Sequence, residues 1–65
     1  MMNTEIYEEI FWTVGEENNL TSWWEIFDSE VFEEVMRRVA ERFNVAEACE
    51  VEGFCDWSNE MAWEL

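Results

Sequence analysis

The sequence predicts an α+β domain in which two to three helices are followed by a C-terminal β-hairpin that packs on them. Up to about residue 43, apolar residues recur every three to four positions, which is the period of an amphipathic helix. From residue 49 onward, apolar and polar residues alternate, which is the period of a half-buried strand. The chain has 65 residues, including five Trp and five Phe, and is predicted to form a single domain (1–65) around an aromatic core.

The first two helices are predicted over residues 3–18 and 23–27. Asn3 or Thr4 can cap the first of them, and Gly15 weakens it towards its end. The second is short, and it begins with a Ser-Trp-Trp-Glu sequence at Ser22 that has the pattern of a capping box. The apolar stripe of the first helix consists of Ile6, Tyr7, Ile10, Phe11 and Val14.

The clearest helix is predicted over residues 29–43, with Asp28 or Ser29 as its cap. Asn44 followed by Val45 is typical of a helix-terminating turn, because Asn tolerates the left-handed conformation and the next apolar residue packs back. The apolar face of this helix consists of Val31, Phe32, Val35, Met36, Val39 and Phe43.

Residues 49–57 and 61–65 are predicted to form the two strands of the hairpin, joined by a loop over residues 58–60. This loop length pairs Trp57 with Met61, so that the apolar faces of both strands point to the core. A short helix capped by Ser58 is the other interpretation of the C-terminal segment.

The two cysteines are predicted to be small core residues. On one straight strand, Cys49 and Cys55 would lie ~20 Å apart. The Cα atoms of bridged cysteines are separated by less than ~7 Å, so the strand prediction excludes a disulfide between them.

Charge is the strongest signal in the composition. The chain has 17 acidic and 3 basic residues, no His, and a net charge of −14. Residues 29–44 hold only four of the acids but all three bases, which are Arg37, Arg38 and Arg42. Ion pairs from Glu33 to Arg37 and from Glu34 to Arg38 are expected to balance the third helix. The remaining acids form an unneutralised field that repels nucleic acid and anionic membranes and attracts basic protein surfaces.

The predicted partner-binding residues lie on the outward faces of the first helix and of the hairpin. Carboxylates recur at roughly 5–6 Å per turn of a helix and at ~6.6–6.8 Å along a strand. These intervals are comparable with the charge spacing of a nucleic-acid backbone, so each acid is interpreted as a phosphate surrogate for Arg or Lys. Trp12 is interpreted either as covered by a loop or as a contact residue. The set is Glu5, Glu8, Glu9, Trp12, Glu16, Glu50, Glu52, Asp56 and Glu64.

In size, charge and layout the chain resembles the small acidic anti-defence proteins of phages and mobile elements, with Glu5, Glu8 and Glu9 as part of its acidic ladder. Anti-CRISPR proteins are the first such family and antirestriction proteins the second, although no residue motif aligns. The resemblance implies a nucleic-acid mimic that blocks the DNA-binding surface of a host defence complex. It implies a basic nucleic-acid-binding protein as the partner, either a CRISPR effector subunit or a restriction enzyme, and no direct binding of nucleic acid.

Other chemistry has little support in the sequence. Without His or Lys, a Ser or Cys nucleophile lacks its usual base, so no enzyme activity is expected. No calcium-binding loop or zinc ligand set is present, and no metal or cofactor is expected. The first residues lack the features of a signal peptide, and no apolar run approaches ~20 residues, which predicts a cytoplasmic protein without membrane contact. The expected state is a monomer or a weak homodimer.

Two other accounts of the acidity stay open. The chain can be an acidic adaptor or regulatory module that binds one protein through an exposed aromatic residue such as Trp12 or Phe54, with the acids as a rim. Alternatively, the acidity is an adaptation to high salt or has no specific role.

Overall fold

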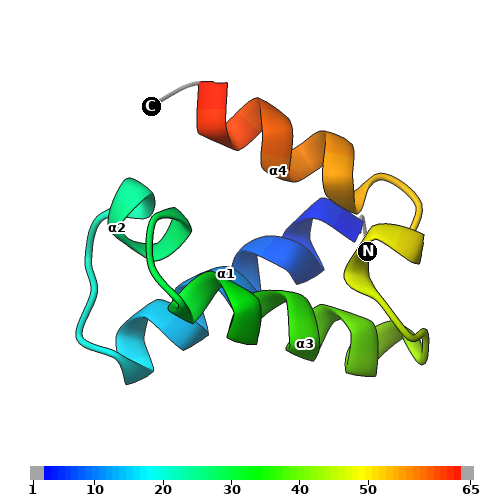
Figure 1. The fold of residues 1–65 in the computed structure, drawn as a ribbon, viewed down its shortest axis with the longest axis horizontal. Coiled ribbons are helices and arrows are strands. Elements are labelled where there is room, and N and C mark those ends of the chain that lie inside the picture. Colours follow the sequence, from blue (N-terminus) through cyan, green and yellow to red (C-terminus); the bar gives the residue numbers. More distant parts are fainter. Residues whose placement is uncertain (1–2, 64–65) are drawn as a thin grey trace.

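The computed structural model describes residues 3–63, and within this range the chain is all helical (Figure 1). Helices α1 and α3 lie side by side, α2 packs on α3, and α4 packs on α1 and on a short 3-10 helix, η1. None of the helices between residues 3 and 63 combines the length and apolarity that a membrane span requires. The elements are α1 (Asn3–Glu17), α2 (Trp23–Phe27), α3 (Val31–Phe43), η1 (Ala48–Glu50) and α4 (Phe54–Trp63).

The predicted C-terminal β-hairpin, and with it the α+β class, is wrong, because no strand forms within residues 3–63. The alternating segment also places Phe54, Trp57 and Met61 three and four positions apart, which is one face of a helix. In α4 the first two of these are buried and the third is half-buried against the core. The alternative of a C-terminal helix is closer to the structure, but α4 starts before Ser58, whose hydroxyl donates to the Cys55 carbonyl at 3.0 Å.

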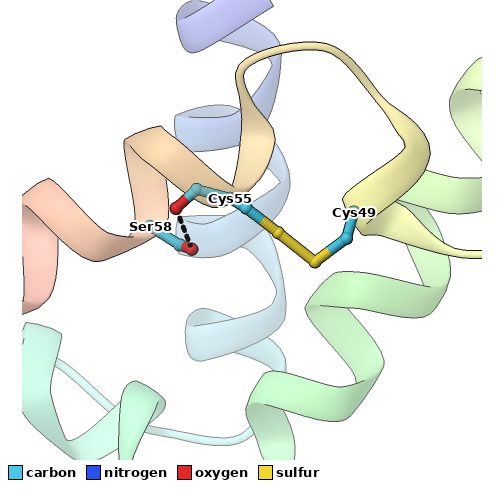
Figure 2. Close-up of a disulfide and its surroundings, with 3 residues drawn as sticks. All are labelled: Cys49, Cys55 and Ser58. Carbon is cyan, nitrogen blue, oxygen red and sulfur yellow. Dashed lines mark hydrogen bonds between the residues drawn. A yellow bond between two sulfur atoms is a disulfide. The ribbon is translucent and has the colours of Figure 1, made fainter.

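The two cysteines form a disulfide, so the prediction that they remain unbonded is also wrong (Figure 2). Their Cα atoms lie 5.4 Å apart because the chain between them is folded into η1 and a turn rather than extended. Gly53 makes this turn possible, since its φ of +86° lies in the region that favours glycine. The bond joins η1 to the first turn of α4 and gives this small domain a covalent link.

The predicted helix boundaries are close to those of the structure. Helix α2 spans the predicted residues, but the Ser22 side chain makes no capping hydrogen bond, so the predicted capping box is absent. At the start of α3, the Ser29 hydroxyl accepts a hydrogen bond from the Val31 amide at 3.2 Å. At its end, Asn44 has a φ of 56° and the Val45 amide donates to the Ala40 carbonyl at 2.9 Å, which confirms the predicted terminating turn.

The core is aromatic and lies where α1, α3 and α4 meet. Phe11 is fully buried, and its ring lies within 6.4 Å, between centroids, of rings from α2, α3 and α4. Tyr7 is also fully buried, and its hydroxyl donates to the Glu52 carbonyl at 2.9 Å. This bond ties the first half of α1 to the turn that the disulfide closes. The buried apolar set is Tyr7, Phe11, Val14, Ile26, Val35, Val39, Ala40, Ala48, Val51, Phe54 and Trp57.

Candidate functional site

Helix α1 carries its buried apolar residues and most of its acids on opposite sides. Tyr7, Phe11 and Val14 are buried against the other helices. The opposite side is open to solvent, and it carries five of the predicted partner-binding residues, all exposed: Glu5, Glu8, Glu9, Trp12 and Glu16. At 1.5 Å of rise per residue, the carboxylates of this face are spread over roughly 17 Å of helix. We call these five residues the acidic face of α1.

The other predicted acids do not form the expected row, because the strand that would have aligned them is absent. Glu50 closes η1, and one oxygen of its carboxylate accepts hydrogen bonds from the Ala46 and Glu47 amides, both at 3.0 Å. Glu52 is exposed in the turn beside α1, to which it is joined through Tyr7, and Asp56 is exposed in the first turn of α4. Glu64 lies outside the described residues.

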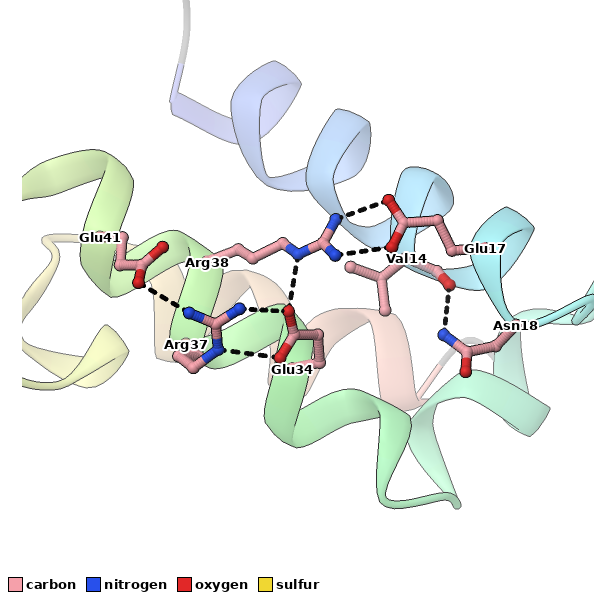
Figure 3. Close-up of polar contacts among 7 residues, drawn as sticks. All are labelled: Val14, Glu17, Asn18, Glu34, Arg37, Arg38 and Glu41. Atoms are coloured by element: carbon pink, nitrogen blue, oxygen red, sulfur yellow. Dashed lines mark hydrogen bonds and ion pairs between the residues drawn. The ribbon is translucent and has the colours of Figure 1, made fainter.

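Two of the three arginines, Arg37 and Arg38, are paired with carboxylates of α1 and α3 (Figure 3). Arg38 forms two hydrogen bonds to Glu17 of α1, at 2.9 and 2.6 Å, and one to Glu34 at 2.8 Å. Arg37 binds the same Glu34 and, at 2.7 Å, Glu41. The predicted pair between Glu34 and Arg38 is therefore confirmed, whereas the predicted Glu33–Arg37 pair is wrong, because Arg37 is held between two other carboxylates.

Arg42, the third cation, forms no ion pair with the acids of residues 3–63. The guanidinium of Arg42 lies 5.9 Å from the centre of the Phe43 ring, in cation–π range. Between residues 3 and 63, the acids that no Arg approaches within ion-pair distance are Glu5, Glu8, Glu9, Glu16, Glu25, Asp28, Glu30, Glu33, Glu47, Glu50, Glu52, Asp56 and Glu60. Every carboxylate on the acidic face of α1 belongs to this group.

The shared arginines change the acidity of their partners. Hydrogen bonds from Arg37 and then from Arg38 lower the pKa of Glu34 from 4.5 to about 2. The hydrogen bonds from Arg38 also lower the pKa of Glu17. Both pairs are partly open to solvent, so their contribution to stability is screened by salt.

This network predicts a specific pH dependence. The folded-state pKa of Glu34 is depressed to about 2. The stabilising contribution of Glu34 is therefore complete above pH 4.5 and is lost as the pH falls through about 2. The Arg38→Gln variant lacks part of this contribution. We therefore expect the difference in unfolding free energy between the wild type and Arg38→Gln to shrink as the pH is lowered across this window.

Urea denaturation followed by circular dichroism at the two ends of the window measures this difference. Arg42→Gln is the matched control, since it removes the same charge from the same helix without breaking an ion pair of the described residues. A wild-type advantage over Arg38→Gln that stays constant down to the acidic end would contradict the assignment.

Trp12 lies within the acidic face and is partly covered by α2. Its ring stacks on that of Trp23, with centroids 5.2 Å apart and an angle of 11° between the planes, while 41% of Trp12 stays exposed. The predicted cover is therefore present in part, although it comes from Trp23 of α2 and not from a loop, and the role of Trp12 as a contact residue stays a prediction. Phe54, by contrast, is 1% exposed, so its prediction as a contact anchor is wrong.

Gly15 is the feature of the sequence that points to the contact between Trp12 and Trp23, and the prediction for Trp12 does not use it. Gly15 is buried against α2, and a Cβ atom at this position would overlap with Cδ1 of Ile26. The missing side chain lets α2 approach α1 at the turn that follows Trp12. This approach brings Trp23 onto the acidic face.

Residues 3–63 contain no group of three or more His, Cys, Asp or Glu side chains arranged to hold a metal ion. A hollow of about 520 Å³ lies between α3 and the segment 45–49, and none of the predicted partner-binding residues lines it.

Together, the fold and this surface define a small acidic protein that is helical over residues 3–63 and in which Arg37 and Arg38 form internal ion pairs. No protein-family model, curated relative or solved structure matches the chain. Its function is therefore inferred from its own charge and geometry.

Proposed function

We propose that the protein is a non-catalytic inhibitor that mimics the charge of nucleic acid and blocks the DNA-binding surface of a host defence complex in the bacterial cytoplasm. A CRISPR effector is the first candidate target and a restriction enzyme the second. The observation that carries this proposal is the set of acids between residues 3 and 63 that lack a cationic partner, including every carboxylate of the acidic face of α1.

These carboxylates suit a basic groove for three reasons. They are exposed, and the rigid helix that carries them is anchored in the core by Tyr7 and Phe11. They lie on one face of the helix over roughly 17 Å, so they can meet several cations of a groove that binds successive phosphates. Finally, no Arg of residues 3–63 pairs with them, so the full strength of a charge-assisted hydrogen bond is open to Arg or Lys of a partner.

The direct test is competition for DNA. The purified protein is mixed with a panel of DNA-binding defence complexes, CRISPR effectors first, and the binding of labelled target DNA is measured across a salt series. We expect one complex to lose its DNA at low salt and to regain it as salt or DNA is increased, because electrostatic association weakens with ionic strength. If every complex kept its DNA at low salt, the proposal would be overturned.

A pair of matched variants tests the surface itself. Glu5→Gln/Glu9→Gln/Glu16→Gln removes three carboxylates from the acidic face of α1 and should raise the concentration needed for inhibition by roughly tenfold or more. Glu30→Gln/Glu33→Gln/Glu60→Gln removes the same charge from exposed positions elsewhere and should have a much smaller effect. Equal losses in the two variants would mean that net charge, and not this face, determines binding.

A second candidate function is an acidic adaptor anchored by an aromatic residue. The exposure of Trp12 favours it, as does that of Trp24 and Trp63, at 55% and 88%. In an anchored interface, Trp12→Ala should cost about 2 kcal/mol or more of binding energy, whereas loss of the surrounding acids should be mild. The charge mimic predicts the reverse order.

A further inference from the structure

Trp12, which is exposed, and Trp23, which is half-buried, form a stacked aromatic pair beside the acids of α1. The two rings are nearly parallel, and Trp12 also meets the buried Phe11 edge-on, with centroids 5.3 Å apart. Trp12 is therefore held from two sides while part of it stays in contact with solvent. A ring fixed in this way presents a preformed binding surface and loses little conformational entropy when a ligand binds.

The surroundings of Trp12 on the helix are negatively charged. Side chains three and four positions away on a helix are its neighbours, at about 5–6 Å between Cβ atoms. For Trp12 these positions are Glu8, Glu9, Gly15 and Glu16. Three of the four are exposed acids without an Arg partner in the described chain, and the fourth is the glycine against which α2 packs.

We propose that Trp12, supported by Trp23, is a stacking platform for an arginine side chain of the partner, with Glu8, Glu9 and Glu16 as the carboxylates that bind its guanidinium. The inference rests on the proposed function and specifies the chemistry of the partner. Arginine fits better than lysine, because its planar guanidinium stacks on an indole face while its N–H groups bind carboxylates in a fork.

Charge repulsion argues against a second copy of this chain as the occupant of the patch. An exposed aromatic patch can also be covered by a second copy of the same chain. Each copy, however, carries a net charge of −14, and the acids next to Trp12 would then face one another. A basic segment removes this repulsion and neutralises the acids, so an arginine-bearing protein surface is the occupant that the patch fits.

The test compares two short labelled peptides of equal length and charge, one of alternating arginine and glycine and the other of alternating lysine and glycine. Fluorescence anisotropy gives the affinity of each for the wild type and for Trp12→Leu. We expect the wild type to prefer the arginine peptide by about fivefold, and Trp12→Leu to remove this preference while it retains binding to the lysine peptide.

Trp63→Leu is the matched control. Trp63 is more exposed than Trp12, but its neighbours three and four positions earlier in α4 are Glu60 and Asn59, and so include only one acid. This variant should keep the arginine preference. If Trp12→Leu kept the preference too, the platform would be refuted. The proposed function would be refuted separately, either if the Glu5→Gln/Glu9→Gln/Glu16→Gln variant bound both peptides as tightly as the wild type or if no complex lost its DNA in the competition assay.

A measurement on the wild type makes the test independent of how any variant folds. In an NMR titration with the arginine peptide, the indole N–H signals of Trp12 and Trp23 should shift more than that of Trp63. Equal shifts at all three indoles, or larger shifts at Trp63, would overturn the assignment of the platform.

Discussion

Phe11→Ala is expected to unfold the protein at room temperature. Phe11 is fully buried, and its ring contacts Trp23 of α2, Phe32 of α3 and Trp57 of α4, with centroids 4.6, 6.4 and 6.0 Å away. Replacement of such a residue by alanine costs about 3–5 kcal/mol through lost burial and the remaining cavity. A core of this size rarely supplies more than about 3–5 kcal/mol in total, so little stability would remain.

Far-UV circular dichroism and urea denaturation measure this effect. Phe43→Ala is the control, because Phe43 is half-buried at the end of α3 and its aromatic contact is with Tyr7 alone, at 5.9 Å. It should lose clearly less stability. Phe11→Leu, which keeps most of the volume, should remain folded and allow a graded comparison. A Phe11→Ala protein as stable as Phe43→Ala would contradict this description of the core.

Loss of the disulfide should produce the second-largest effect on folding. The bridged cysteines are six residues apart, and closure of so short a loop stabilises a protein by about 2 kcal/mol in the chain-entropy model. The bond also holds the turn whose Glu52 carbonyl accepts the hydrogen bond from Tyr7. We therefore expect the Cys49→Ser/Cys55→Ser variant, and the wild type with its disulfide reduced, to unfold at lower urea concentration.

The reductant provides its own control. It should lower the stability of the wild type and leave that of the double serine variant unchanged. The non-reduced wild type should also contain no thiol that reacts with a colorimetric thiol reagent, since both cysteines are bonded. Two reactive thiols per chain, or a stability that reduction does not change, would contradict the disulfide.

The sequence predicts the first three helices because each has a long or well-delimited pattern. Helix α3 shows several turns of apolar periodicity and ends at an Asn that takes the left-handed conformation. Helix α1 has the same periodicity, and the five residues of its acidic face are exposed as the pattern requires. In α1 and in α3, the apolar periodicity of the sequence and the burial seen in the structure both indicate a helix.

The C-terminal segment could not be predicted in the same way, because its pattern is short and ambiguous. The spacing of Phe54, Trp57 and Met61 fits one helix face, while the alternation from Cys49 to Trp57 fits a strand. What decides between them is tertiary: the disulfide and the turn at Gly53 shorten the path between η1 and α4. The exclusion of a disulfide depended on the strand and was wrong for the same reason.

The candidate site was predictable only where it lies on a single element. The acids of α1 share a face because helical spacing alone aligns them. The link from Arg38 to Glu17 and the stacking of Trp23 on Trp12 join residues of different helices, so no local pattern contains them. The prediction aligned Glu50 and Asp56 on one face of a strand. In the structure Glu50 lies in η1 and Asp56 in α4, so the two carboxylates do not form a common row.

The hydroxyl of Tyr7 gives the native chain an optical probe of its own tertiary structure. Tyr7 is the single tyrosine of the sequence. Burial raises the pKa of its hydroxyl above the ordinary value of 10.0. A hydrogen bond from Asn3 opposes this increase, and the negative charge of Glu52 adds a smaller increase. Ionised tyrosine absorbs ultraviolet light at longer wavelength than the neutral phenol. In alkaline solution, the absorbance of the phenolate therefore reports the fraction of molecules in which Tyr7 has lost its burial and its hydrogen bond to Glu52, and no label has to be introduced.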